Sequence, residues 1–105
     1  SINSDEVDCD SMFNGCSGLT SLDLSGINVN ENTIIEMSWA FNNCKKLTSL
    51  DLSGLNITSY YRTMFGGCSA LQTIYARGCN EATISVIEDR LTAAGIRDQV
   101  TIITT

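Results

Sequence analysis

The sequence predicts an α/β solenoid, in which short coils of chain stack on one another, and three observations lead to this fold class. The octapeptide LTSLDLSG occurs at residues 19–26 and again at 47–54, and a degraded third copy, LQTIYARG, follows at 71–78. A second motif, an apolar residue followed by Phe, two small or polar residues and Cys, precedes each copy. One such unit is too short to bury its own apolar side chains, so neighbouring units must stack and share a core.

The octapeptide predicts a short strand. Its LxxLxL pattern alternates with a period of two, which directs Leu22 and Leu24 inward and Asp23 outward. Because the copies are equivalent, we expect their strands to pair in parallel, about 4.8 Å apart, as a sheet on one face of the solenoid. Burial of each Leu, Ile or Phe contributes roughly 1.5–3 kcal/mol, which makes stacking favourable even in a short array.

The segments with Phe and Cys predict the other face. Phe and Cys are three residues apart and a Leu follows after another three, so each segment suits a short helical turn with one apolar side. The cysteine then occupies a stacked core position, where a free thiol packs as a small hydrophobe. The core cysteines predicted in this way are Cys16, Cys44 and Cys68, which follow Phe13, Phe41 and Phe65.

The repeat period is 28 residues from the first unit to the second and 24 from the second to the third. The four extra residues fall within 29–40, where an insertion only lengthens a surface loop. The units end in SIN, GIN, GLN and GCN, and the aligned asparagines predict a structural ladder. At a coil corner, a buried amide can serve backbone groups that the strands leave unpaired. The ladder comprises Asn3, Asn28, Asn56 and Asn80.

The C-terminal stretch leaves the repeat pattern and predicts a cap. Asn80 can begin a helix at about 81–94, and a strand is expected at about 100–104. The chain therefore divides into leucine-rich repeats over 1–80, about three units that start within a repeat, and a C-terminal helix–strand cap over 81–105. Because the first unit is incomplete, we expect further coils or a different domain upstream.

The composition argues against several classes of function. The 105 residues include no histidine, which excludes Ser-His-Asp and Cys-His nucleophile systems and histidine-containing zinc sites. The formal net charge of −6 disfavours nucleic-acid binding, which uses a basic surface. No stretch approaches the roughly 18 apolar residues of a membrane span. We therefore expect no enzyme activity, no metal site, no cofactor and no membrane-spanning segment.

The outward positions of the three strands predict a binding face, because a rigid array presents side chains at regular spacing. Asp23 and Asp51 would stand near 5 Å apart, a separation also found between the carboxylates of retaining glycosidases. Repetition of the motif on a shallow sheet would give the same pair of aspartates without a catalytic role. The two carboxylates would then be solvated charges, or a weak contact for a cation or polar ligand. The candidate binding face comprises Ser21, Asp23, Ser25, Ser49, Asp51, Ser53, Thr73, Tyr75 and Arg77.

Other residues fall outside these columns. Cys79 occupies an inward slot and is expected in the core, whereas Cys9 has no assigned slot. With five cysteines, at least one thiol stays outside any internal disulfide. The acidic run DEVDCD at 5–10 does not have calcium-loop spacing and is expected to be a solvated face. The aromatic residues of the connections, which can anchor a partner or seal a loop, are Trp39, Tyr60 and Tyr61.

The repeated motif MFxGCxxLTSLDLSxxN resembles the repeats of the BspA-like leucine-rich-repeat surface proteins of bacteria. The resemblance covers about residues 2–80, and the tail GCNEATISVIEDRLTAAGIRDQVTIIT is similar to an ending common in that family. The chain departs from the family pattern within 40–43 of the second unit and at 75–77 of the third. These departures affect the presumed binding face more than the fold.

The resemblance implies a secreted or bacterial cell-surface module for protein binding and cell adhesion, whose partner is an extracellular protein or glycan. The alternative is a structural spacer or stalk segment of a larger surface protein, with no ligand of its own. An enzyme is disfavoured by the missing histidine and by the absence of metal-ligand clusters and of a phosphate-binding glycine loop.

Overall fold

The computed structural model describes residues 6–8, 13, 15–25, 34–36, 41–55, 57–59 and 64–105, which form two parallel sheets, one α-helix and one short 3-10 helix. The three-stranded sheet consists of β1 (Glu6–Asp8), β3 (Ile34–Glu36) and β5 (Ile57–Ser59). The four-stranded sheet consists of β2 (Ser21–Asp23), β4 (Ser49–Asp51), β6 (Thr73–Tyr75) and β7 (Thr101–Ile103). The helices are α1 (Glu81–Ala93) and η1 (Arg97–Gln99).

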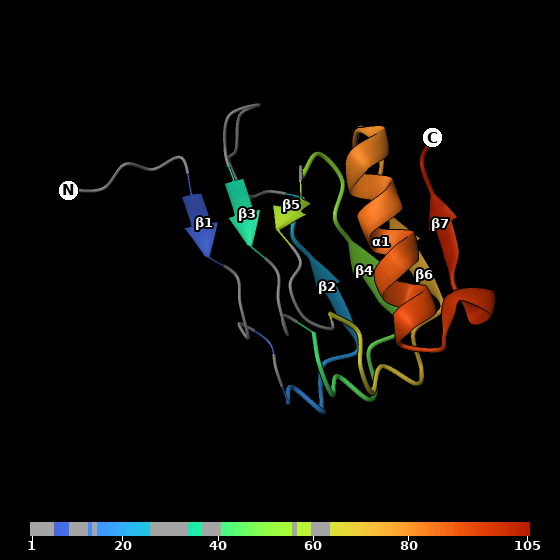
Figure 1. Ribbon diagram of the computed structural model, residues 1–105. Helices are drawn as coiled ribbons and strands as arrows, with labels where there is room; N and C mark the ends of the chain where they lie inside the picture. Colours follow the sequence, from blue (N-terminus) through green and yellow to red (C-terminus); the bar gives the residue numbers. More distant parts are fainter. Residues whose placement is uncertain are drawn as a thin grey trace.

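The strands of the two sheets alternate along the chain, so each coil contributes one strand to each sheet. In Figure 1, β1, β3, β5 and α1 follow one another from left to right, and β2, β4, β6 and β7 form a second row. The helix α1 packs against β5 and takes the next place in the first row. The chain is therefore a solenoid-like stack that carries a parallel sheet, as the repeat predicted.

The repeat sets the register of the four-stranded sheet. Equivalent residues of successive copies pair directly, in a ladder through Leu22, Leu50, Ile74 and Ile102. Leu50 and Ile74 on the central strands are fully buried, whereas Leu22 on the edge strand β2 is half-buried. Because side chains alternate along a strand, the residues on either side of this ladder point away from the core.

The other side of the coil differs from the expectation. The sequence interpretation placed short helical turns there, and the described residues instead form the three-stranded parallel sheet. Its strands have the sequences EVD, IIE and ITS, and their β-branched residues favour extended backbone. The helical prediction was wrong because the spacing of Phe and Cys fits a tight turn equally well.

The segments with Phe and Cys form tight turns, in which each cysteine N–H donates to the phenylalanine carbonyl three residues earlier. The residue before each cysteine has a left-handed backbone, with φ of 80° at Gly15, 64° at Asn43 and 81° at Gly67. A positive φ interrupts a right-handed helix. The N–H groups of Gly15 and Asn43 donate to the carbonyls of Asn42 and Gly66, at 2.8 Å and 2.6 Å. These backbone bonds therefore connect neighbouring coils.

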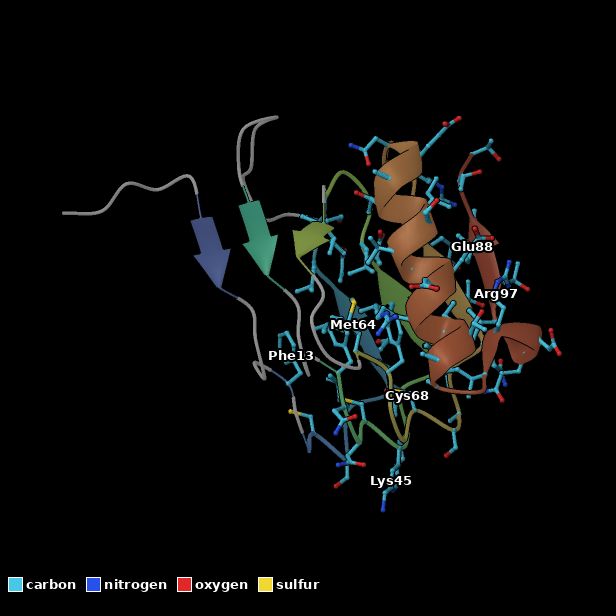
Figure 2. All side chains as sticks on the ribbon, viewed as in Figure 1. Phe13, Lys45, Met64, Cys68, Glu88 and Arg97 are labelled. Atoms are coloured by element: carbon cyan, nitrogen blue, oxygen red, sulfur yellow. The ribbon has the colours of Figure 1, made fainter. Side chains whose placement is uncertain are left out.

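The core repeats from coil to coil in the same way. The Phe41 ring stacks between the rings of Phe13 and Phe65, with centroids 5.9 Å apart on each side. The buried thiols of Cys44 and Cys68 donate to the carbonyls of Phe13 and Phe41, at 3.1 Å and 2.9 Å. Burial raises the pKa of both thiols, to about 11 for Cys68. Figure 2 labels Phe13 in the first coil and Cys68 in the third.

The remaining described cysteines, Cys16 and Cys79, are half-buried, and all four described cysteines are free thiols. Cys16 belongs to the first coil, so it is less covered than its equivalents Cys44 and Cys68. The Cys79 thiol donates to the Leu52 carbonyl at 3.3 Å, and burial raises its pKa. The described cysteines thus pack as core side chains.

The helix α1 closes the edge of the three-stranded sheet. The Asn80 side chain accepts from the Thr83 N–H at 2.8 Å and caps the helix. The buried Thr83 hydroxyl accepts from the Ile57 N–H of β5 at 3.0 Å, so this edge donor is satisfied. Ile87 and Leu91 are fully buried and join the core from the helix.

The asparagine ladder does not extend to Asn80 as expected. Asn80 is exposed and caps α1, so it does not serve as a buried corner amide. The other three members, Asn3, Asn28 and Asn56, lie outside the described residues.

Candidate binding face

The outer face of the four-stranded sheet is the side opposite the buried leucine and isoleucine ladder. Two columns of side chains cross this face in strand register. The first column contains Ser21, Ser49, Thr73 and Thr101, and the second contains Asp23, Asp51, Tyr75 and Ile103. Ser25, Ser53 and Arg77 follow two residues after the second column. All these side chains are exposed or half-buried, so each of the predicted residues is accessible to solvent.

The aspartates of the second column form turns at the ends of their strands. The Asp23 Oδ1 atom accepts from the Ser25 N–H at 2.8 Å and also from the Ser25 hydroxyl. The hydroxyl and then the N–H of Ser25 lower the pKa of Asp23. The Asp51 Oδ1 atom accepts from the Ser53 N–H at 2.9 Å in the same manner. The repeated Asp-Leu-Ser thus has a structural use as an Asx-type turn, which sequence reasoning missed.

The third copy replaces this turn by a contact between an aromatic ring and a cation. The guanidinium of Arg77 lies over the Tyr75 ring, 4.8 Å from its centroid. The Arg77 N–H donates to the Ser53 hydroxyl and its Nε donates to the Thr105 carbonyl, both at 3.0 Å. The exposed guanidinium is therefore positioned by the Tyr75 ring and the Thr105 carbonyl, and the backbone of Arg77 is bonded to the preceding coil.

Sequence reasoning missed Thr101 and Ile103 as members of this face. They lie on β7, which pairs with β6 and extends both columns by one strand. The signal was present, because VTIIT at 100–104 has the same alternation as QTIYA at 72–76. Without a leucine motif, however, this strand was assigned only to the cap.

Asp23 and Asp51 pair in register and perform the same turn-forming task, whereas an acid–base pair needs two different environments. Among the described residues, no three or more His, Cys, Asp or Glu side chains gather to hold a metal ion. No helix in the described part of the chain is long and apolar enough to cross a membrane.

Some predicted features lie outside the residues that the structure describes. These are Cys9, Trp39, Tyr60, Tyr61 and the outer positions of the acidic run at 5–10.

The stacked coils, the parallel sheet and the regular columns define a leucine-rich-repeat protein. The chain matches the family model described as BspA type leucine rich repeat region (6 copies) over residues 9–103, so it belongs to the BspA-type leucine-rich-repeat family. This match confirms the resemblance carried by the repeat motif. No curated protein and no solved structure shows a significant match to the chain. Leucine-rich repeats generally form a non-enzymatic fold for binding or scaffolding.

Proposed function

We propose that this chain is a non-catalytic recognition module that binds an extracellular protein through the outer face and acts in cell adhesion at a bacterial surface. BspA-type repeats are typically associated with bacterial surfaces, and leucine-rich repeats generally bind proteins. The observation that carries the proposal is the change in the third copy. There Tyr75 and Arg77 replace the aspartate and serine of the first two copies, while the buried ladder is kept.

The side chains at this end of the face suit a protein interface. Tyrosine and arginine are enriched among the residues that dominate binding energies. Arg77 contacts the Tyr75 ring and the Thr105 carbonyl, so part of its side-chain freedom is already lost before binding. No described residue accepts from its Nη groups, which can therefore donate to a carboxylate of the partner. Ile103 supplies half-buried apolar surface in the same column.

A structural spacer in a larger surface protein is the second candidate function. The observation that favours it is the use of Asp23 and Asp51 in turns. The architecture alone accounts for these residues, so the part of the face on β2 and β4 needs no ligand to explain it.

The test is a binding screen of the chain against immobilised extracellular matrix proteins, followed by the variant Tyr75→Ala/Arg77→Ala. We expect this variant to weaken the interaction by about tenfold or more, because two interface anchors are removed. The matched control is Ser21→Ala/Ser49→Ala, which shortens two side chains at the other end of the face and leaves the affinity within about twofold. Circular dichroism should show that both variants are folded.

An affinity unchanged by Tyr75→Ala/Arg77→Ala would place the binding site away from the outer face. If no matrix protein binds at all, the spacer function is favoured.

A further inference from the structure

A second surface feature lies beside the start of strands β6 and β7. An open groove of about 650 Å³ runs there, within the roughly 300–1,000 Å³ of typical small-molecule sites. We call it the Gln99 groove, and its polar lining residues are Thr48, Ser69, Gln72, Thr73, Gln99 and Thr101. Ala70 is its half-buried apolar residue, whereas the side chain of Leu71 is fully buried.

Gln99 places a fixed hydrogen-bond acceptor at this groove. Its amide nitrogen donates to the carbonyls of Ser69 and Leu71, at 3.0 Å and 2.9 Å, so both of its protons are engaged. These two bonds also determine which end of the amide is the oxygen. The Oε1 atom accepts no hydrogen bond from any described residue and remains available to a ligand.

Hydroxyl groups surround this acceptor. Thr73 and Thr101 are paired in register on β6 and β7, so their side chains lie about 5 Å apart. Neither hydroxyl, nor that of Ser69, has a hydrogen-bond partner among the described residues. The Thr48 hydroxyl donates to the Thr20 carbonyl at 3.0 Å and can still accept. The groove thus offers several groups that both donate and accept.

The groove is also free of charge. None of its lining residues is ionisable. A charged ligand would find no counter-charge among these lining residues, and a neutral polar ligand needs none.

We propose that the Gln99 groove binds a neutral oligosaccharide. Sugar hydroxyls donate and accept at the same atom, which matches the threonine and serine hydroxyls and the fixed Gln99 oxygen. The C–H face of a sugar ring can lie on the half-buried Ala70 side chain. The groove shares Thr73 and Thr101 with the outer face, but this inference goes beyond protein binding at Tyr75 and Arg77 and does not depend on it.

The test uses the whole chain and neutral tetrasaccharides of glucose and of N-acetylglucosamine, with amide chemical shifts measured by NMR. We expect at least one tetrasaccharide to shift the amides of Gln72, Thr73, Gln99 and Thr101 at millimolar concentration. The variant Thr73→Val/Thr101→Val keeps side-chain shape and strand propensity but removes two hydroxyls. It should weaken the affinity by about tenfold, since each net hydrogen bond contributes modestly. Gln99→Met is a second variant with the same expected direction.

The matched control is Ser21→Ala, which removes a hydroxyl from the same column on the distant strand β2. It should leave the affinity unchanged, as should Tyr75→Ala/Arg77→Ala, which separates this site from protein binding. The proposal is overturned if no tetrasaccharide shifts these four amides, or if Thr73→Val/Thr101→Val and Gln99→Met bind as tightly as the parent. A sialylated oligosaccharide or a peptide that binds the groove more tightly than every neutral sugar would also overturn it.

Discussion

The strands β2 and β4 of the outer face differ from the strands β6 and β7, although all four share one scaffold. In the first pair, Asp23 and Asp51 accept from the N–H two residues on and stabilise turns. In the second pair, the same column carries Tyr75 and Ile103. The inward ladder stays apolar throughout, with Leu50 and Ile74 both fully buried. The exact repeat therefore reflects the architecture of the stack, whereas the outward residues of the altered third copy are free to serve recognition.

The largest expected effect tests whether the two pairs of strands share one core. We expect Leu50→Ala and Ile74→Ala each to lower the free energy of unfolding by about 2–5 kcal/mol, because both leave a cavity between fully buried neighbours. Leu22→Ala should cost less, since Leu22 is only half-buried on an edge strand. Chemical denaturation measures all three. Similar costs for Leu22 and Leu50 would contradict the described burial.

A second, smaller effect concerns the core under the altered copy. Burial raises the pKa of Cys68 from 9.0 to about 11. The pKa of the thiol is higher in the folded than in the unfolded state. The buried neutral thiol therefore contributes fully to the free energy of unfolding below about pH 9, and this contribution is lost as the pH rises toward 11. We expect the loss to reach about 2 kcal/mol.

The measurement for this prediction is denaturation of the parent and of Cys68→Ala at pH 8 and pH 11. The variant should show a smaller loss of stability between the two pH values, whatever its stability at pH 8. Equal losses in the two proteins would mean that the thiol is not protected from ionisation.

The smallest effect distinguishes the turn-forming aspartates from the recognition residues. Asp51→Ala removes the acceptor of the Ser53 N–H and should lower the free energy of unfolding by about 0.5–1.5 kcal/mol. Asp51→Asn keeps a side-chain oxygen and should cost less. Neither substitution should change partner binding, as measured in the assay used for Tyr75→Ala/Arg77→Ala. A loss of binding with Asp51→Ala as large as with that double variant would remove the distinction between the strands.

Much of the scaffold was predictable because the repeat is a strong signal. Equal spacing of Leu22, Leu50 and Ile74 predicts parallel strands in register, and these residues do pair directly. The three-stranded sheet was not predicted, because strands of three residues such as IIE and ITS are too short for periodicity to separate them from loops. The left-handed φ of Asn43 was also missed, and Gly15 and Gly67 at the equivalent positions were its signal.

The outward positions of the first three strands of the face were predictable from the sequence, but the roles of the residues there were not. Alternation alone assigns Asp51, Tyr75 and Arg77 to the outside of the sheet. It could not show that the Asp51 carboxylate is used by a turn or that Arg77 is held over Tyr75.

Local spacing was thus sufficient to predict the period, the strand register and the inward and outward positions, because these depend on a side-chain alternation that is visible in the sequence. Contacts between distant segments decided the rest. β7 joins the sheet beside β6, α1 satisfies the edge of β5 through Thr83, and Gln99 reaches the carbonyl of Leu71. Each of these contacts satisfies backbone donors or acceptors of one segment with groups of a distant segment, and such pairs form only when the coils stack.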